Sequence, residues 1–217
     1  AQPAPIAQVI EAPEAALGNA ASAWVYAPFS WMGTLAEADL RPEWVSQHYL
    51  LPGGQIRATA RLRLQKSLST ASQDQQLLSR LISQAHREPV HCLTLQADRY
   101  PDDPARQVRL LLSHWDGFGR ALQSKHKTEP GPAYAVAVDG TLILHNQRIR
   151  EVDANPRWRV SERVEYNLRG QPMRVYRPYF ADRHGYINDA SLRTGGLCDQ
   201  HTYDAAGRVV QTLNADG

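Results

Sequence analysis

The sequence predicts a mainly β protein of stacked antiparallel hairpins with one helical insertion. Three observations lead to this prediction. Several short segments alternate apolar and polar residues, one stretch has the apolar spacing of an amphipathic helix, and one turn motif occurs three times. With 217 residues, of which 42% are hydrophobic and 21% charged, the chain has a globular composition and the length of one or two domains.

Charge and cysteine content argue against several functional classes. Lys and Arg total 24 and Asp and Glu total 22, so the net charge of +2 predicts no nucleic-acid partner. No stretch reaches the roughly 18 apolar residues of a membrane-spanning helix, so we expect no membrane span. Cys92 and Cys198 are the only cysteines, which excludes a disulfide-rich scaffold and leaves one bridge or two free thiols open.

The ends of the chain have the sequence of connecting segments. Residues 1–19 are rich in Ala and Pro, which predicts a linker, and they lack the basic stretch and apolar block of a signal peptide. The chain opens on Ala1 and closes on a turn-like stretch at 214–217. We therefore expect both ends to be cuts from a larger protein.

Residues 20–69 are predicted as a strand-rich segment. The apolar run 23–26 favours a strand and leads into a turn-rich aromatic cluster. Between Gln55 and Leu64, apolar residues alternate with Arg and Thr. This period of two is typical of a strand with one apolar and one basic face.

Residues 70–88 are predicted as a helical insertion. The candidate capping residues are Ser72 and Thr70, and Pro89 ends the helix. The stripe that we expect to face the core recurs at three- and four-residue spacing and consists of Leu77, Leu78, Leu81, Ile82 and Ala85.

Residues 89–217 are predicted as a continuous segment of β-sheet. Short apolar runs between turns that contain Gly or Asn favour strands. The predicted strands lie at 90–95, 108–112, 135–138, 142–144, 163–166 and 209–213.

The repeated motif reads aromatic residue, Asp or Asn, two variable residues, Gly, and then Arg or Gln. Its positions are Trp115, Asp116, Gly119 and Arg120; Tyr166, Asn167, Gly170 and Gln171; and Tyr203, Asp204, Gly207 and Arg208. Asp or Asn at the first position of a type I turn accepts backbone hydrogen bonds, and Gly at the fourth adopts positive φ. We interpret all of them as structural turn residues of hairpins that stack, because a single hairpin is marginal in water.

We expect no catalytic residue, metal site or cofactor. The sequence lacks a nucleophile elbow, a phosphate loop, a dinucleotide fingerprint and a zinc-protease helix. His91 and Cys92 are neighbours on a predicted strand and point to opposite faces, so they do not converge with Cys198 and His201 on one ion. The repeat aromatics are interpreted as stacking between hairpins rather than as sugar platforms.

The repeated motif resembles the Tyr-Asp (YD) repeat of RHS proteins. Four longer strings, at 115–123, 157–160, 170–180 and 203–210, together resemble the late part of the B component of bacterial ABC-type (Tc) insecticidal toxin complexes. The resemblance covers most of residues 20–217. The second repeat departs from the pattern with Asn for Asp and Gln for Arg, but Asn serves the turn equally well.

The resemblance implies a structural role. In this family the B and C components build a hollow shell from a long spiralling β-sheet of the RHS type, which encloses the unfolded toxic end of the C component. The shell docks onto a pore-forming A component. This chain would then be a non-enzymatic, secreted segment of the shell wall. Its partners would be the rest of the B component, the C component with its enclosed cargo and, indirectly, the A component.

A second interpretation stays open beside the shell wall. YD-repeat proteins also occur on cell surfaces, so the chain would alternatively be an extracellular binding module for carbohydrate or a cell surface. The self-cleaving aspartate site of the C component is not carried over, because Asp103-Pro104 lies outside that motif's context.

Overall fold

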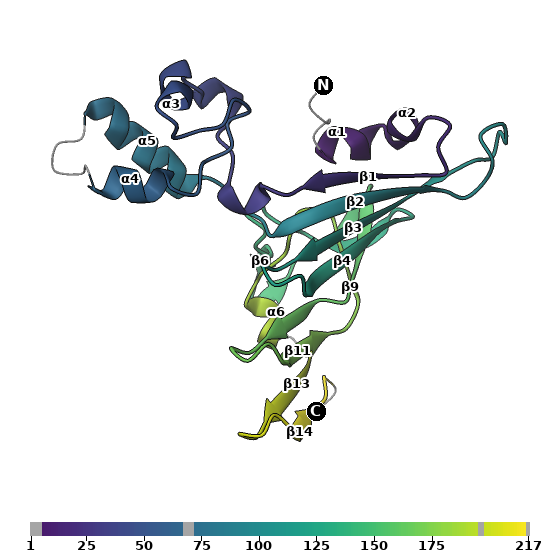
Figure 1. Ribbon diagram of the computed structural model, residues 1–217. Coiled ribbons are helices and arrows are strands. Elements are labelled where there is room, and N and C mark those ends of the chain that lie inside the picture. The colour runs from purple at the N-terminus through teal and green to yellow at the C-terminus, as the bar shows by residue number, and fades with distance from the viewer. Residues whose placement is uncertain (1–5, 67–71, 195–197, 216–217) are drawn as a thin grey trace. The chain divides into compact units, whose positions relative to one another are not determined.

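The computed structural model describes residues 6–66, 72–194 and 198–215, which form two compact units (Figure 1). The first unit combines the residues up to Tyr26 with residues 91–217 and holds the β-sheets. The second unit, residues 27–90, is mainly helical. The predicted mainly β fold is confirmed.

The first unit consists of mainly antiparallel sheets, with one parallel pair, β12 and β5, in the larger sheet. In its described part, an eight-stranded sheet has the order β1-β2-β3-β4-β9-β12-β5-β8, and a four-stranded sheet the order β10-β11-β13-β14. The strands of the larger sheet are β1 (Ser22–Ala27), β2 (Val90–Ala97), β3 (Val108–Trp115), β4 (Ala121–Thr128), β5 (Gly131–Tyr134), β8 (Glu151–Ala154), β9 (Arg157–Ser161) and β12 (Tyr179–Ala181). The others are β10 (Val164–Tyr166), β11 (Pro172–Tyr176), β13 (Cys198–Tyr203), β14 (Val209–Leu213) and the separate pair β6 (Leu144–His145) and β7 (Arg148–Ile149).

Alternating side chains give the first unit its core. In β3, Leu110 and Leu112 are buried and Arg109 is exposed, as the period of two predicts. The strands predicted at 23–26, 90–95, 108–112, 163–166 and 209–213 are confirmed as β1, β2, β3, β10 and β14. The prediction at 135–138 is wrong, because the structure has only an isolated bridge there, between Val136 and Leu142. The strand predicted at 142–144 shares only Leu144 with β6.

The N-terminal segment is helical rather than a linker. α1 (Ile6–Glu11) and α2 (Pro13–Leu17) follow one another, and α2 packs against β3. Ile6, Val9 and Ile10 are spaced as one helical face and are buried. Pro13 occupies the first turn of its helix, where a missing N–H costs nothing. The part of the predicted linker at 1–5 lies outside the described residues.

The strand predicted between Gln55 and Leu64 is wrong, because α4 (Ala60–Lys66) begins inside it. Ala60 and Leu64 are both buried, and their spacing of four fits a helical face as well as an alternating strand. Leu62, which the strand pattern places inside, is 61% exposed. The alternating pattern was misleading because Ala60 and Leu64, the two buried residues, fit the spacing of a strand and of a helix equally well.

The predicted helix is confirmed as α5 (Gln73–Gln84), with Ser72 as its cap. The side chain of Ser72 accepts from the backbone N–H of Gln75, and Gln75 returns the bond to the backbone of Ser72. The other candidate cap, Thr70, lies outside the described residues. The helical unit is larger than the predicted insertion at 70–88, since it also contains α3 (Pro42–Ser46) and the 3-10 turns η1 (Ser30–Met32) and η2 (Glu37–Asp39).

The helical unit has a core of its own and is inserted in the chain between two neighbouring strands. Its buried cluster contains Trp44, Leu50, Leu78 and Ile82. The unit lies in the chain between β1 and β2, which are neighbours in the sheet. The N–H of Ala97, at the end of β2, donates to the carbonyl just before β1 over 2.9 Å. The pair is thus a hairpin whose turn is replaced by residues 28–89.

The two cysteines are free thiols whose ionisation is disfavoured by burial. Cys92 and Cys198 are both buried and free, and burial raises the pKa of each thiol. Among the described residues, no helix has the length and apolar character to cross a membrane.

Candidate functional site: the corner ladder

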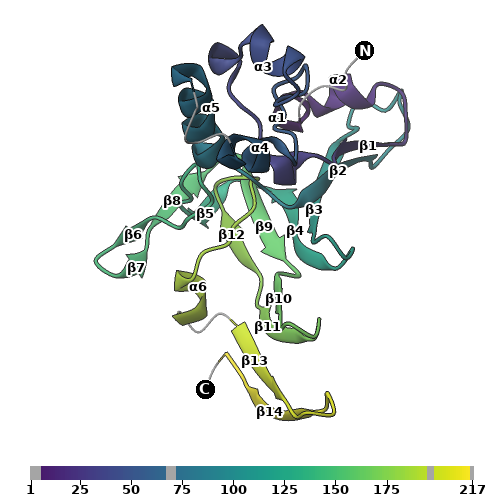
Figure 2. The same ribbon diagram turned by 60° about the vertical axis from the view of Figure 1, so that its left-hand side comes forward.

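The three copies of the repeated motif form three hairpin corners of the first unit. Residues 115–120 join β3 to β4, residues 166–171 join β10 to β11, and residues 203–208 join β13 to β14. Figure 2 shows the three turns on the same side of the unit, one below the other in chain order. We call this set of corners and their mutual contacts the corner ladder.

Each corner has the same backbone hydrogen bonds. In the first, the N–H of Gly119 donates to the carbonyl of Asp116 (3.1 Å), and the N–H of Asp116 donates to the carbonyl of Arg120 (3.0 Å). Gly119 has φ +76°, which glycine adopts at little cost. Asn167, Gly170 and Gln171, and Asp204, Gly207 and Arg208, repeat this pattern at 2.9–3.1 Å. A register shift where each corner begins marks the bulge that closes the turn.

The acid or amide of each corner also organises the corner's last residue. Asp116 Oδ1 accepts from the N–H of Arg120 (2.9 Å), and Asp116 Oδ2 accepts from its Nε (2.6 Å). Asp204 and Arg208 make the same two bonds at 2.9 and 2.8 Å. In the second corner, Asn167 donates to the side-chain oxygen of Gln171 over 2.9 Å.

These bonds set the ionisation of the corner acids. Burial alone would raise the pKa of Asp116, but hydrogen bonds from the backbone and guanidinium of Arg120 outweigh it and lower the pKa. In Asp204 the bonds from the backbone and side chain of Arg208 likewise lower the pKa. Both carboxylates are therefore held in the charged form that the turn needs.

Contacts from corner to corner turn the three hairpins into one array. The guanidinium of Arg120 lies over the ring of Tyr166, 4.4 Å from its centroid, and the hydroxyl of Tyr166 donates to the carbonyl of Ala121 over 3.0 Å. One corner later, the hydroxyl of Tyr203 donates to the carbonyl of Pro172 over 2.7 Å. Ala121 and Pro172 are equivalent, since each is the first residue after its corner. Two successive corners thus repeat one contact.

Polar side chains add further contacts between the second and third corners. Gln171 Nε2 donates to the carbonyl of Gly207 over 3.1 Å, and Arg169 Nη1 donates to the carbonyl of Ala205 over 2.8 Å. The sequence predicts that the aromatics stack apolar surfaces between hairpins. The structure adds that the hydroxyl groups of Tyr166 and Tyr203 donate to backbone carbonyls of the preceding hairpin. Arg120 both pairs with Asp116 in its own corner and covers the ring of Tyr166 in the next.

A charged cluster beneath the second corner was not predicted. Glu165 of β10 accepts from Tyr176 Oη (2.6 Å), Arg174 Nη1 (2.9 Å), Arg193 Nε (3.2 Å) and Arg163 Nη2 (3.2 Å). Burial would raise the pKa of Glu165, but these donors outweigh it and lower the pKa. The cluster ties β10, β11 and α6 (Ser191–Thr194) together, and Arg193 is 28 positions from Glu165, so the full set forms no local motif.

Buried polar groups fasten the segment before α6 to β4. Lys125 is fully buried, and its ammonium group donates to the carbonyls of Arg183 (3.1 Å) and Gly185 (2.5 Å). Gln123 exchanges two hydrogen bonds with the backbone of Ile187. These contacts hold the chain against the sheet where a regular strand is absent.

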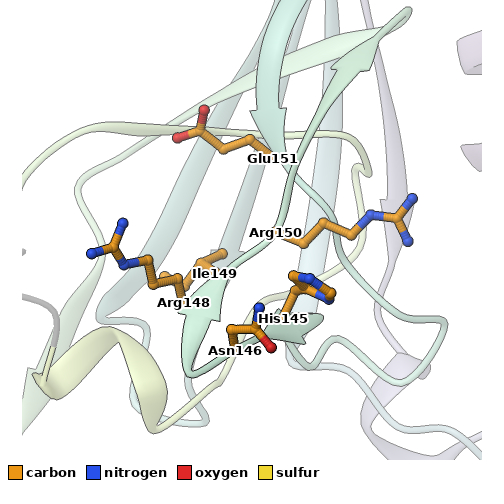
Figure 3. A pocket seen from close by; sticks show the side chains of 6 residues that line it. All are labelled: His145, Asn146, Arg148, Ile149, Arg150 and Glu151. Atoms are coloured by element: carbon orange, nitrogen blue, oxygen red, sulfur yellow. The ribbon is translucent and has the colours of Figure 1, made fainter.

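An open pocket lies at the β6–β7 hairpin, away from the corner ladder. It has a volume of about 770 Å³ and is lined by His145, Asn146, Arg148, Ile149, Arg150 and Glu151. Figure 3 shows that these side chains point in different directions rather than toward one centre. The pocket therefore has no arrangement that suggests a reaction.

The chain was compared with protein-family models, curated proteins and solved structures. No protein-family model and no curated protein matches the chain. Among solved structures, TcdB2-TccC3 without its hypervariable C-terminal region matches 100% of the chain with TM-score 0.82 and 33% identity. TcdB2-TccC3-Cdc42 matches with TM-score 0.80 and 31% identity. A mutant Photorhabdus luminescens Tc holotoxin pore matches 94% of the chain with TM-score 0.75 and 33% identity.

The fold that carries the corner ladder is similar to a segment of these toxin-complex structures. The resemblance predicted from the sequence is confirmed, and the chain is a segment like that of Tc toxin B components. It spans about a tenth of the length of the chains that it matches, since it covers 10% of each of the three.

Proposed function

We propose that the chain is a non-enzymatic, secreted wall segment of a toxin-complex shell, which encloses and protects an unfolded toxic cargo before translocation. Its proposed partners are the rest of a B component and a C component with its cargo, and indirectly a pore-forming A component. The observation that carries the proposal is the corner ladder, because it links the turns of successive hairpins: side chains join the first corner to the second across two sheets, and β11 pairs with β13 between the second and the third. A wall that excludes solvent and proteases needs this continuity.

Hydrogen-bond saturation is the physical requirement for such a wall. An unpaired strand edge attracts other chains, and a gap in the sheet admits them. The hydroxyl of Tyr166 donates to a carbonyl of β4, and that of Tyr203 donates to a carbonyl of β11. Each hydroxyl thus satisfies a carbonyl of the preceding hairpin, next to the bulge that interrupts the regular pairing of that hairpin.

The exposed apolar residues of β14, in the last hairpin, also support the proposal. Val209, Val210 and Leu213 of β14 are each at least half exposed. Val209 and Val210 are neighbours on a strand and therefore point to opposite faces, so β14 is uncovered on both. A strand of this kind gains its stability from neighbours, as a piece of a larger sheet does.

The alternative function, binding of carbohydrate or a cell surface, rests on a different strand. Trp24 and Tyr26 of β1 are 56% and 63% exposed and share one face. Exposed rings in this arrangement are able to stack on a sugar. A glycan array separates the two functions, because a wall segment gives no hits, whereas a binding module gives hits that are lost with Trp24→Ala.

A chimera tests the wall function directly. The matching segment of TcdB2 is replaced by this chain, the chimera is produced with TccC3, and digestion of the cargo by an added protease is followed over time. We expect the cargo to resist digestion. A chimera that fails to assemble, or one whose cargo is cut as fast as free unfolded cargo, would contradict the proposal.

A further inference from the structure

A buried arginine beside the charged cluster has donors that its protein neighbours leave unused. Arg163 lies between β9 and β10, and its side chain is only 2% exposed. Its Nη2 donates to Glu165 over 3.2 Å and to Asn188 over 3.5 Å. Its Nε and Nη1 are also buried and have no hydrogen-bond partner within the described residues. Because an unsatisfied donor is most costly on a buried cation, these nitrogens call for an acceptor.

Two tyrosines form the surroundings of this guanidinium group. The ring of Tyr176 covers one of its faces, with the guanidinium carbon 4.4 Å from the ring centroid. The hydroxyl of Tyr179 is buried and likewise has no partner among the described residues. Burial raises the pKa of Tyr179 to about 12, although the nearby charge of Arg163 acts in the opposite direction. The hydroxyl therefore keeps its proton and is a further donor next to the cation.

The charges around Arg163 do not balance. The guanidinium groups of Arg163, Arg174 and Arg193 all donate to the single carboxylate of Glu165. A second acid, Asp189, interacts electrostatically with Arg163, but its oxygens accept from backbone N–H groups elsewhere. Three positive groups thus face two negative ones, which leaves one positive charge in a largely buried place.

We propose that Arg163 and Tyr179 form a binding site for a small monovalent inorganic anion, with chloride as its simplest occupant. One negative charge matches the one positive charge in excess, whereas a dianion would overcompensate it. A spherical ion accepts from several N–H and O–H donors at once without requiring a planar arrangement. The neighbouring stretch 195–197 reads Gly-Gly-Leu and carries no carboxylate that would take the place of the ion.

The site lies where three parts of the first unit meet. Tyr179 belongs to β12 of the eight-stranded sheet, and Arg163 leads into β10 of the four-stranded sheet. The carbonyl of Arg163 accepts from the N–H of Tyr176 at the end of β11, and Asn188 comes shortly before α6. A bound anion therefore stabilises the junction of the two sheets. This inference goes beyond the proposed wall function and does not depend on it.

Hydrogen exchange in the full chain tests whether chloride stabilises this junction. Sodium gluconate is replaced by sodium chloride at constant ionic strength, and the slowing of exchange at the β10 and β11 amides is measured. For a dissociation constant of about 20 mM, raising chloride from about 5 to about 500 mM should slow their exchange roughly twentyfold. The α5 amides belong to the separate helical unit and are the internal control, for which we expect no change.

An added carboxylate should compete with the anion. Asn188→Asp keeps the acceptor beside Nη2 of Arg163 and supplies the missing negative charge from the protein. We expect it to weaken chloride binding about tenfold, so that β10 and β11 are protected at low chloride and respond less to more. Asn146→Asp, on the turn between β6 and β7, adds the same charge away from the site and should keep the wild-type response.

Removal of one hydroxyl tests the second donor. Tyr179→Phe keeps the buried ring and loses the hydroxyl, for which we expect roughly fivefold weaker chloride binding. Tyr203→Phe is the matched control in the third corner. It removes a hydroxyl that donates to the carbonyl of Pro172, so it should speed exchange equally at every chloride concentration.

Bromide locates the ion. In crystals grown with sodium bromide, we expect an anomalous peak beside Nε or Nη1 of Arg163. Several results would overturn the site: exchange that does not respond to chloride, a response shared equally by the α5 amides, or a response unchanged in both Asn188→Asp and Tyr179→Phe. Bromide found only at the protein surface would do so as well. Cargo protection by the chimera is measured separately, so the wall function stands or falls without this site.

Discussion

The helical unit and the last hairpin of the chain bury their apolar side chains to opposite extents. In the unit formed by residues 27–90, Trp44, Leu50 and Leu78 are at most 1% exposed. In β14 every residue is exposed. The helical unit thus supplies its own core, whereas the hairpin depends on what pairs with it.

The largest expected effect comes from emptying the closed core. Trp44 is buried, and its indole N–H donates to Asp74 over 2.6 Å. Trp44→Ala should destabilise the helical unit by about 3–5 kcal/mol, because it creates a cavity in the core. Hydrogen exchange of the α5 amides measures this. Val210→Ala on β14 is the comparison and should change stability by less than about 0.5 kcal/mol; equal effects would contradict the contrast.

Acid should weaken the sheet unit through His114. This side chain is fully buried on β3, and burial first, then the nearby His91, Lys125 and His184, lower its pKa well below the ordinary value of 6.5. The unfolded chain therefore takes up a proton below pH 6.5 that the folded chain refuses. Stability should fall as the pH drops below that value, by at most about 1.4 kcal/mol per pH unit.

Urea unfolding at a series of pH values measures this dependence. His114→Gln should flatten it below the pH at which free histidine titrates, whereas the exposed His145→Gln should leave it unchanged. A stability that stays level in wild type as the pH falls through that range would show that His114 is not held neutral by its surroundings.

The corner glycines should show a smaller, purely conformational effect. Gly119 has φ +76°, and a Cβ placed there would meet nothing within 4 Å. Gly119→Ala should therefore cost about 1–2 kcal/mol through backbone strain alone. Gly117 also has open space and lacks the positive φ, so Gly117→Ala is the control and should be nearly neutral. Thermal unfolding of the two variants gives the difference, and equal melting temperatures would argue against the turn geometry.

The hydroxyls of the ladder should have the smallest effects, graded by burial. Tyr166→Phe removes a partly buried hydrogen bond and should cost about 1 kcal/mol, while Tyr203→Phe removes an exposed one and should cost about 0.5 kcal/mol. Urea unfolding of both variants provides the comparison. The order would be reversed if the third corner contributed more to folding than the second.

The repeats were predictable from sequence because each corner is local. The bonds among Asp116, Gly119 and Arg120 lie within a few residues, so residue type and spacing are enough to recognise them. The sequence did not predict which atoms make the contacts between corners. The sequence shows that Tyr166 is aromatic, but only the register of the hairpins brings its hydroxyl to Ala121.

The helical unit and the charged cluster show where sequence reasoning fails. Ala60 and Leu64 satisfy a strand period and a helix period equally, and the choice depends on packing against α5. Glu165 meets Arg193 across 28 positions, and such a pairing leaves no local pattern. The N-terminal helices were missed because Pro13, a linker signal in composition, is also a favoured residue in the first turn of a helix.

A double-mutant cycle on Arg120 and Tyr166 tests most directly that neighbouring corners are joined. The stabilities of the wild type, Arg120→Met, Tyr166→Leu and the double variant are measured in the full chain by urea unfolding. A coupling free energy of about 1 kcal/mol between the two positions is predicted from the stacked guanidinium and ring. Strictly additive effects would show that the two corners do not support one another and would contradict the ladder on which the wall function depends.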